Sequence, residues 1–425
     1  MKQSGYNFVM YDELYSYWYN SLTSAFFRLS QELGRKLEDS LASPEQLSAE
    51  LPKLFDKLVD NGFLVSDDCD ELELIRKKNE KSVHSKNYFL IIMPTLNCNY
   101  KCWYCIQSHV PSSMSVETME RLKRHLDYMI DEQKITSLTI DWFGGEPFMY
   151  YKKVVEPLSR YAAAKCADAG IPFLNGATTN GYFITNEMSL QFKELEFNRF
   201  QITLDGNKEF HDKVKYQQGC LSAFDHVLKN IARILINNEN AQIVLRINYT
   251  HETLTKDIVN QVNSIIPQNL RDRVIVCPRK VWQEEVDKSF GKVLKGVIDE
   301  FALSGYKVQR FEPVTDFVPC YTSRKYYNAV VYNGNVVKCT ACNDLYEDDP
   351  LGVLLADGKI QWRDGVDLQY QQKTFENPRC LACKRLPACM GLCAKNHLRG
   401  ATYCKYEAVD EDFEKSVVDW IKSQY

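Results

Sequence analysis

Between residues 88 and 278, short β-rich runs alternate with helical patterns, and no other feature restricts the fold as strongly. Helical patterns such as those at 116–131 and 224–236 separate the runs. Because consecutive parallel strands need a helical crossover, this order predicts an α/β fold, a partial (β/α)6 TIM-like barrel over residues 88–311. The six runs are at 88–93, 137–142, 172–179, 199–204, 242–248 and 273–277.

The loop after the first of these runs carries three cysteines. Residues 98–105 read CNYKCWYC, which places Cys98, Cys102 and Cys105 at the spacing C-x3-C-x2-C. A closed structural zinc site needs four protein ligands, whereas three thiolates leave one iron of a four-iron cluster open. Barrel chemistry lies on loops at the carboxyl ends of the strands, and this loop is at such an end.

Distinctive short segments follow the next three strands. Residues 144–147 read GGEP, 178–181 read TTNG, and 201–206 read QITLDG, with His-Asp at 211–212. A glycine pair lets the backbone approach a ligand closely, and Glu146 can accept a hydrogen bond from an ammonium group. A bare Gly-Gly is also compatible with an ordinary βα turn.

Taken together, these segments closely resemble the motifs of the radical S-adenosylmethionine (radical SAM) superfamily. The resemblance implies a 4Fe-4S cluster on the three cysteines and S-adenosyl-L-methionine as the cofactor. In relatives, a hydroxyl and a basic residue hold the methionine carboxylate; here Thr203 fits the first position and Lys215 replaces the usual arginine. Lysine is a point charge rather than a planar fork. The residues that the resemblance assigns to the cofactor are Tyr104, Gly144, Gly145, Glu146, Asn180, Thr203, Lys215 and Arg246.

The region from residue 312 to 425 is rich in cysteine. Eight of the fifteen cysteines lie between positions 320 and 404, and their order resembles the SPASM extension of radical SAM enzymes, which carries two auxiliary 4Fe-4S clusters. The resemblance assigns Cys320, Cys339 and Cys393 to the first cluster, which Cys342 either completes or leaves with an open iron. It assigns Cys380, Cys383, Cys389 and Cys404 to the second.

A zinc ribbon is the competing interpretation of these cysteines. It would use the pairs Cys339-x2-Cys342 and Cys380-x2-Cys383, and it would leave the remaining four cysteines of the region without a role.

Residues 1–66 predict a small α+β unit. A hairpin is expected at 6–10 and 14–19, one helix from Pro44 to Gly62, and a strand at 63–65, followed by a charged linker helix within 67–87. The unit loosely resembles the winged-helix-like precursor-recognition domain of maturases of ribosomally made peptides (RiPPs). A winged helix that binds nucleic acid is disfavoured, because residues 1–66 are more acidic than basic.

Composition limits the location and the partners. The net charge is −4 and there is no apolar stretch of membrane-spanning length, so we expect a cytoplasmic enzyme without nucleic-acid or membrane partners. Without a sign of export, metal ligation is favoured over disulfides. The resemblance implies a flavodoxin- or ferredoxin-type reductant.

Two reactions fit this architecture. One is maturation of a precursor peptide, bound through its leader, with a thioether or carbon–carbon crosslink as the product. The alternative is an anaerobic sulfatase-maturating enzyme, which makes formylglycine. Such enzymes usually begin close to the cluster motif and carry an aspartate where this chain has Thr340, whereas here about ninety residues precede Cys98. The sequence does not identify a catalytic acid or base.

Overall fold

The computed structural model divides the described residues into two units. One comprises residues 86–309 and 326–364, and the other comprises residues 1–85, 310–325 and 365–425. Within the described ranges, no helix has both the length and the apolar character needed to cross a membrane. The structure describes the chain except for residues 286–289, 310–319, 342–349, 367–369, 371–372, 392, 395–403 and 405–409, and only the backbone of residues 410–412.

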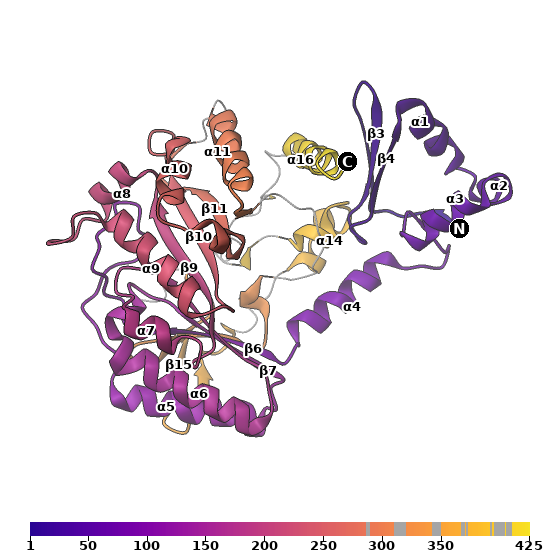
Figure 1. The fold of residues 1–425 in the computed structure, drawn as a ribbon. Helices are drawn as coiled ribbons and strands as arrows, with labels where there is room; N and C mark the ends of the chain where they lie inside the picture. The colour runs from indigo at the N-terminus through magenta and orange to yellow at the C-terminus, as the bar shows by residue number, and fades with distance from the viewer. Residues whose placement is uncertain are drawn as a thin grey trace. The chain divides into compact units, whose positions relative to one another are not determined.

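The larger unit is built on a parallel sheet with the strand order that the alternation predicts (Figure 1). Each strand pairs in parallel with the next one along the chain, which confirms the predicted βα repeat. The strands are β6 (Asn87–Met93), β7 (Ser137–Trp142), β8 (Phe173–Thr179), β9 (Phe197–Asp205), β10 (Gln242–Tyr249) and β11 (Val274–Lys280).

The sheet has strands besides the six predicted ones, and at one edge it continues beyond residue 311, where the sequence analysis expected the barrel to end. β12 (Lys307–Val308) joins one edge and β13 (Tyr327–Val331) pairs in parallel with β6 at the other. Every residue of β13 is buried, which explains why it pairs inside the sheet. β14 (Asn335–Val337) follows across a turn in which Gly334 has a φ of 89°, a conformation that favours glycine. β15 (Gly352–Leu354) and β16 (Ile360–Trp362) complete the sheet.

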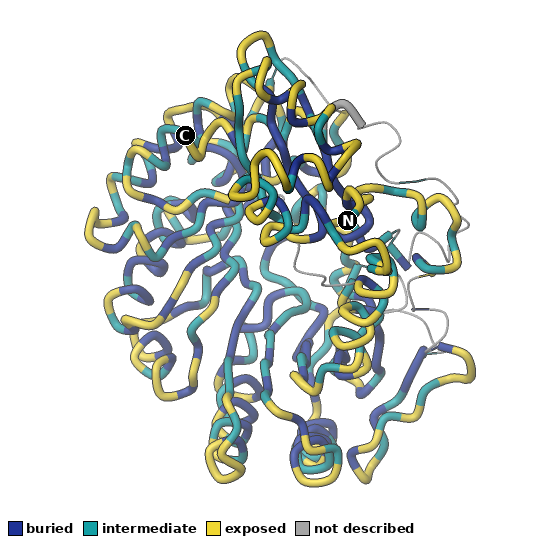
Figure 2. The backbone as a smooth tube through the Cα atoms, turned by 90° about the vertical axis from the view of Figure 1, so that its right-hand side faces the viewer, coloured by how far each residue is buried: buried dark blue, intermediate teal, exposed yellow. Residues whose placement is uncertain are grey.

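Helices cover one face of this sheet, and alternation along the strands decides which side chains meet them (Figure 1). Ile243, Leu245 and Ile247 of β10 are fully buried in the core with the helices, so Arg246 faces the other side, the interior of the barrel. Buried residues accordingly run along the strands in Figure 2. The helices are α5 (Val116–Asp127), α6 (Glu156–Ala169), α7 (Asn186–Gln191), α8 (Lys208–Val214), α9 (Ala223–Asn237), α10 (Asp257–Asn263) and α11 (Gly291–Leu303), with short turns η1 (Tyr128–Glu132), η2 (Pro147–Tyr150), η3 (Tyr151–Val155) and η4 (Gln268–Arg273).

The smaller unit begins with a three-stranded antiparallel sheet followed by three helices. Strands β2 (Asn7–Tyr11) and β3 (Tyr15–Asn20) confirm the predicted hairpin, and β4 (Phe26–Ser30) adds an edge strand that was not predicted. α1 (Gln31–Ser40) was also missed. The prediction of one helix up to Gly62 was wrong: α2 (Pro44–Glu50) and α3 (Pro52–Asp60) are separate. Pro52 has no N–H and restricts the residue before it, so it ends the first helix.

The termini of the chain belong to the same unit. β1 (Lys2–Gln3) pairs with β5 (Leu64–Val65), and α4 (Glu71–Val83), capped by Asp70, forms the predicted linker helix. α16 (Asp410–Lys422) is the last helix. Short elements near the cysteines are η6 (Tyr321–Ser323), η8 (Thr374–Glu376), α13 (Pro378–Leu381) and α14 (Leu386–Cys389).

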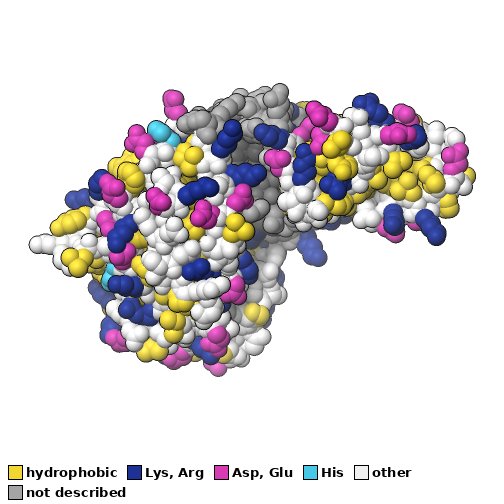
Figure 3. All heavy atoms as spheres, turned by 45° about the horizontal axis from the view of Figure 1, so that its top comes forward, with side chains coloured by type: hydrophobic (Ala, Val, Ile, Leu, Met, Phe, Trp, Pro, Cys, Tyr) yellow, Lys and Arg dark blue, Asp and Glu magenta, His cyan; other side chains and the backbone are white. Residues whose placement is uncertain are grey.

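Both faces of the small sheet are covered. Val417 and Ile421 of α16 pack against one face, with Phe8 and Tyr19. Trp18 on the opposite face packs with residues of α1–α3. The sheet therefore leaves its edges as the open sides. Hydrophobic side chains also gather on the surface of this part (Figure 3), where Leu33 and Leu51 are exposed.

Candidate active site

The predicted cluster loop follows β6 at the carboxyl end of the parallel sheet. The sulfur of Cys98 accepts a hydrogen bond from the backbone N–H of Tyr100 at 3.4 Å. Cys98 and Cys102 are half-buried and Cys105 is exposed, with its sulfur 3.5 Å from Nε2 of His109. Burial raises the pKa of the Cys98 thiol to about 11 and also raises that of Cys102. Iron binding at this loop must therefore displace thiol protons.

The glycine pair of the GGEP segment packs against the backbone of the cluster loop. A Cβ on Gly144 would lie 2.3 Å from the carbonyl oxygen of Thr95, and one on Gly145 would lie 2.0 Å from that of Asn97. The N–H groups of Gly145 and Glu146 donate to these same two carbonyls, at 3.2 and 2.9 Å. The glycines thus allow the two loops to pack closely against each other. The sequence analysis expected them to let the backbone approach a ligand.

Glu146 joins this contact to the end of β8. Its carboxylate is fully buried and accepts hydrogen bonds from the N–H of Phe148, the hydroxyl of Thr179 and the N–H of Asn180. Burial raises the pKa of Glu146 to about 7. Asn180 in turn donates from Nδ2 to Oδ1 of Asn99 at 2.8 Å and lies 3.8 Å from the sulfur of Cys98. The TTNG turn therefore contacts the cluster loop directly.

Tyr104 ties the cluster loop to the ends of β9 and β10. Its hydroxyl donates to Oδ1 of Asp205, and Nδ2 of Asn248 donates to the Tyr104 hydroxyl at 3.1 Å. Arg246 donates from Nε to Oδ1 of Asn248 at 2.8 Å. The sequence analysis gave no role to Asp205, although its place in the TLDG segment at the end of a strand was a usable signal.

Lys215 lies behind this network. Its side chain is 3% exposed, its Nζ donates to the carbonyl of Thr203 at 2.8 Å, and it lies 3.6 Å from Oδ2 of Asp205. Nδ1 of His211 accepts a hydrogen bond from the N–H of Asp205. Burial holds the pKa of His211 well below its usual value, so the imidazole is neutral.

The residues that the structure brings together fit an iron–sulfur cluster with an adjacent ligand. Three thiols on one loop supply sulfur donors to iron, and the loops that surround them are packed too closely for side chains at Gly144 and Gly145. Within the described residues, no three Cys, His, Asp or Glu side chains converge as on a single metal ion. Such convergence is a property of mononuclear sites, because the thiolates of a cluster bind different irons.

The C-terminal cysteines divide between the units. Cys380, Cys383, Cys389 and Cys404 are close enough for their charges to interact: Cys383 and Cys404 both raise the pKa of Cys380 and of Cys389, after the larger effect of burial. Cys320 and Cys393 belong to the same unit as these four, and Cys339, which is buried, belongs to the barrel unit. Cys342 lies outside the described residues.

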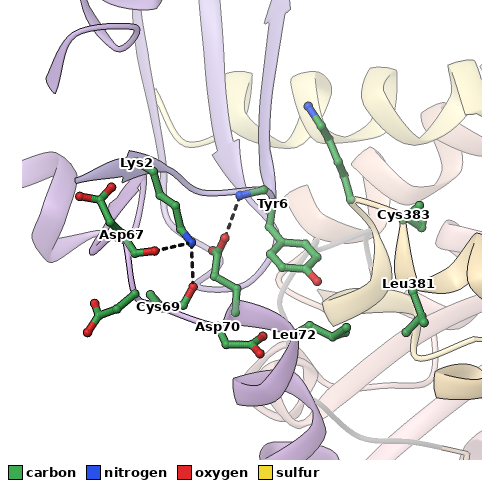
Figure 4. Close-up of a pocket in the computed structure, with 13 residues that line it drawn as sticks. Lys2, Tyr6, Asp67, Cys69, Asp70, Leu72, Leu381 and Cys383 are labelled. Atoms are coloured by element: carbon green, nitrogen blue, oxygen red, sulfur yellow. Dashed lines mark hydrogen bonds between the residues drawn. The ribbon is translucent and has the colours of Figure 1, made fainter.

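A polar pocket of about 590 Å³ lies beside Cys383 in the smaller unit (Figure 4). Lys2 and Asp67 line one side of it, Leu381 and Cys383 the other, and Tyr6 projects between them. Lys2 donates to the carbonyls of Asp67 and Cys69, both at 3.0 Å. The ammonium group of Lys2 is thus engaged within the wall of the pocket.

Comparison with known proteins identifies the barrel. Residues 92–258 match the family model of the radical SAM superfamily. A serine-type anaerobic sulfatase-maturating enzyme from Bacteroides thetaiotaomicron is 27% identical over 182 residues, which is 38% of this chain and 42% of the relative. The radical SAM cyclopropyl synthase TigE from Paramaledivibacter caminithermalis is 19% identical over 384 residues, 81% of this chain and 77% of the relative.

Solved structures share the fold. Native anSMEcpe with bound AdoMet aligns with a TM-score of 0.56 and 18% identity, over 79% of this chain and 100% of that one. The chain spans about two fifths of the length of the sulfatase-maturating relatives that it matches in sequence. The family implies a 4Fe-4S cluster and S-adenosylmethionine. Residues 92–258 therefore form a radical SAM domain.

Proposed function

We propose that this chain is a cytoplasmic radical SAM/SPASM maturase that installs a thioether or carbon–carbon crosslink in a ribosomally made peptide. The observation that carries the peptide part is the edge strand β4, whose side chains pack against the same core as those of α3. Partly buried side chains of β4 (Phe27, Leu29) and of α3 (Leu54, Phe55) each pack at the margin of the same buried core. An extended peptide can add to an open strand edge and place alternate side chains against such a margin.

The order of elements supports a recognition domain at residues 1–66. Three antiparallel strands followed by three helices are compatible with a winged-helix-like unit, and no catalytic constellation lies in residues 1–66. A leader peptide bound there would raise the local concentration of the core peptide at the barrel. The linker at 67–87, the barrel at 88–311 and the auxiliary-cluster domain at 312–425 complete the proposed organisation.

In the barrel, Cys98, Cys102 and Cys105 would hold the first cluster, and Tyr104, Gly144, Gly145, Glu146, Asn180, Thr203 and Arg246 would surround the cofactor. When bound, the cluster and S-adenosylmethionine together supply a radical that can abstract hydrogen from an unactivated carbon. The chain's own residues orient the two groups: Glu146 and Asn180 fix the turn beside Cys98, and Asp205 fixes Tyr104. The C-terminal cysteines would hold the two auxiliary clusters, which would supply electron-transfer chemistry.

Sulfatase maturation is the second candidate, and sequence similarity does not favour it over peptide crosslinking. Sulfatase-maturating relatives match 38% and 34% of this chain. The relative that spans 81% of it is named a cyclopropyl synthase, and closing a cyclopropane forms a carbon–carbon bond. The larger share of this chain that the cyclopropyl synthase covers supports a reaction that forms a bond in a peptide over formylglycine formation.

Cluster content is the first test. Anaerobic reconstitution should give about twelve irons per chain, four for each cluster. The triple change of Cys98, Cys102 and Cys105 to Ala should leave about eight irons and abolish reductive cleavage of S-adenosylmethionine. A preparation with stoichiometric zinc and about four irons would instead support the zinc ribbon.

Leader recognition needs a test that keeps the smaller unit intact. Deleting residues 1–85 would uncover Val417 and Ile421 of α16 and would also remove Tyr6 and Leu22, which pack with Leu386 beside Cys389. We therefore choose Leu29→Asp on β4, with Leu14→Asp on the exposed β2–β3 turn as the matched control. The leader peptide is taken from a precursor reading frame sought beside the gene. In a binding titration, Leu29→Asp should bind this leader at least tenfold more weakly than the parent, and Leu14→Asp should bind it as the parent does. Equal binding by both variants, with unchanged melting, contradicts recognition at β4.

Peptide chemistry gives a second test. Strand addition uses the N–H groups of alternate residues of the added peptide. N-methylation of one alternate set in the leader should abolish binding, and methylation of the other set should not. Rapid formylglycine formation on a sulfatase peptide, with no product from the precursor, would favour the second candidate.

A further inference from the structure

His109 lies four residues after the last cysteine of the cluster loop and contacts it. Its Nε2 atom is 3.5 Å from the sulfur of Cys105. Among the residues that the structure describes, this sulfur has no other hydrogen-bond partner, and Nδ1 of His109 has none. The tautomer of the imidazole decides which of the two atoms donates. Neither the motifs nor the cofactor site described above gives this contact a role.

The segment that carries His109 is tied back to the start of the cluster loop. The hydroxyl of Ser112 donates to the carbonyl of Val110 at 2.9 Å and accepts from the N–H of Leu96 at 2.9 Å. The hydroxyl of Thr95 donates to the carbonyl of Ser112 at 2.7 Å. Three hydrogen bonds therefore hold the segment beside the loop. Support of this kind keeps a functional side chain in one geometry.

Iron binding would decide the direction of the hydrogen bond between His109 and Cys105. A cysteine that binds iron is a thiolate, which accepts hydrogen bonds and has no hydrogen to donate. Nε2 of His109 must then carry the hydrogen. It does so in the imidazolium and also in one tautomer of the neutral ring. The imidazole can therefore act as a donor to this sulfur without a change in its charge.

Cys105 is also the most accessible cysteine of the loop. It is exposed, whereas Cys98 and Cys102 are half-buried and the sulfur of Cys98 already accepts from the N–H of Tyr100. Hydrogen bonds to the cysteine sulfurs and exposure to solvent set the reduction potential of an iron–sulfur cluster. The reduced cluster carries one more negative charge than the oxidised one, so a donor at its sulfur stabilises the reduced form more.

We propose that His109 donates a hydrogen bond from Nε2 to the sulfur of Cys105 and thereby raises the reduction potential of the first cluster. Ser112 acts as a positioning residue that holds the imidazole in place. The electron comes from the flavodoxin- or ferredoxin-type reductant, and the hydrogen bond neither forms nor breaks a bond to iron. The proposal rests on the proposed placement of the first cluster on Cys98, Cys102 and Cys105.

A zinc site is the competing use of His109. Three cysteines and one histidine are a ligand set of structural zinc, which binds all four at once. Within the described parts of the chain, no three Cys, His, Asp or Glu side chains converge as such a site requires. His109 contacts one of the three cysteines only. The geometry therefore favours a hydrogen bond to a single sulfur.

The test is a redox titration of reconstituted enzyme without S-adenosylmethionine, followed by electron paramagnetic resonance. The signal of the first cluster is the one that the triple alanine variant of the loop cysteines lacks. His109→Leu removes the donor, His109→Gln keeps an N–H group, and Ser112→Ala removes the support. His84→Leu is the matched control, because His84 is an exposed histidine of the other unit. The titration needs no peptide, so its outcome does not depend on which peptide is the substrate.

The expected shift has a sign and a size. Loss of a hydrogen bond to a charged group corresponds to roughly a tenfold change in an equilibrium constant. The potential of His109→Leu should therefore be about 59 mV more negative than that of the parent, the value of a tenfold change for one electron. His109→Gln should stay within about threefold of the parent, Ser112→Ala should shift in the same direction as His109→Leu, and His84→Leu should not shift. Equal potentials of His109→Leu and the parent overturn the proposal.

A second measurement distinguishes a hydrogen bond from ligation. In enzyme with 15N-labelled histidine, pulsed electron paramagnetic resonance of the reduced first cluster should show a weak coupling to one imidazole nitrogen. This coupling should be absent from His109→Leu. A coupling as strong as that of an iron-bound imidazole, no coupling in the parent, or stoichiometric zinc on the loop overturns the proposal. So does a His109→Leu protein that takes up about four irons fewer than the parent, because the histidine would then be needed for assembly.

Failure of the cluster placement would give a different result. In that case the triple alanine variant would keep every signal of the parent, whatever the potentials of the His109 variants. If His109→Leu does not fold, Ser112→Ala answers the same question, because it leaves the imidazole in the chain and removes the hydroxyl that holds its segment. An unshifted potential in folded Ser112→Ala, together with a missing nitrogen coupling in the parent, would then overturn the proposal.

Discussion

Adding one methyl group at Gly145 tests whether the cluster loop and the GGEP segment are held together by close packing. In Gly145→Ala, the new Cβ would lie 2.0 Å from the carbonyl oxygen of Asn97, 2.4 Å from its carbon and 2.7 Å from the carbonyl oxygen of Leu96. All three are backbone atoms, so no side-chain rotation can relieve the contact. The loop that leads into Cys98 has to move instead.

The loss of stability in Gly145→Ala follows from these contacts. Overpacking in a well-packed site typically costs about 1–3 kcal/mol, and displacement also weakens the hydrogen bonds from Gly145 to Thr95 and from Glu146 to Asn97. For a unit of this size, each kcal/mol lowers the melting temperature by roughly 2–4 °C. We therefore expect a decrease of about 2–12 °C in the protein without iron, and about eight rather than twelve irons after reconstitution.

Gly291→Ala is the matched control. No heavy atom lies within 4 Å of a Cβ at this position, the first residue of α11, and replacing such a glycine stabilises a protein by about 0.4–1 kcal/mol. Circular dichroism melting of the iron-free proteins and iron analysis after reconstitution give the two readouts. A Gly145→Ala protein that melts within about 1 °C of the parent and takes up the same iron would refute the packing argument.

Three further changes test other parts of the structure. Burial raises the pKa of Glu146 from 4.5 to about 7. Between these two pH values the folded state keeps a proton that the unfolded state loses. The free energy of unfolding of the iron-free protein should therefore fall as the pH rises from 4.5 to about 7. Glu146→Gln should reduce this slope in urea titrations, and an unchanged slope would contradict the assignment. Tyr88→Phe should lower the free energy of unfolding by about 1–3 kcal/mol, because the buried hydroxyl lies 2.6 Å from Nε2 of His125 and accepts a hydrogen bond from Asn328 at 3.0 Å. Tyr216→Phe, at an exposed site, is the control in thermal melting. Equal losses of stability in the two variants would argue against the hydrogen-bond network. Ile421→Ala should destabilise the smaller unit by about 2–5 kcal/mol, and Lys415→Ala on the exposed side of α16 should not. Equal denaturation midpoints of these two variants would show that α16 does not pack on the sheet in solution.

The parallel sheet could be predicted from the sequence because its strands are buried by helices on one face. Residues 137–142 and 242–248 read as β-rich runs between amphipathic helices, and they are strands in the structure. β4 could not be predicted, because Phe26–Ser30 runs directly into α1 without a turn signal. The single helix predicted to reach Gly62 was wrong because apolar periodicity outweighed Pro52, whose missing N–H ends the helix.

The candidate active site could also be predicted only in part. Spacing alone could place three cysteines and GGEP at adjacent strand ends. It could not show that the glycines contact the backbone of residues 95–97, because that contact depends on how two loops approach one another. It could not show either that Lys215 is buried against Asp205, since a lysine after a short helix is usually exposed.

The packing of α16 on the N-terminal sheet has a consequence for synthesis on the ribosome. Phe8, Met10, Tyr17 and Tyr19 leave the ribosome first, but Val417 and Ile421, which cover them, are made about 400 residues later. At roughly 5–20 residues per second, this aromatic face waits about 20–80 s for its cover. During that interval the nascent chain presents an apolar surface next to an open strand edge, which favours association with other chains. We expect the yield of folded protein to depend on chaperones that bind nascent chains, and on the speed of translation.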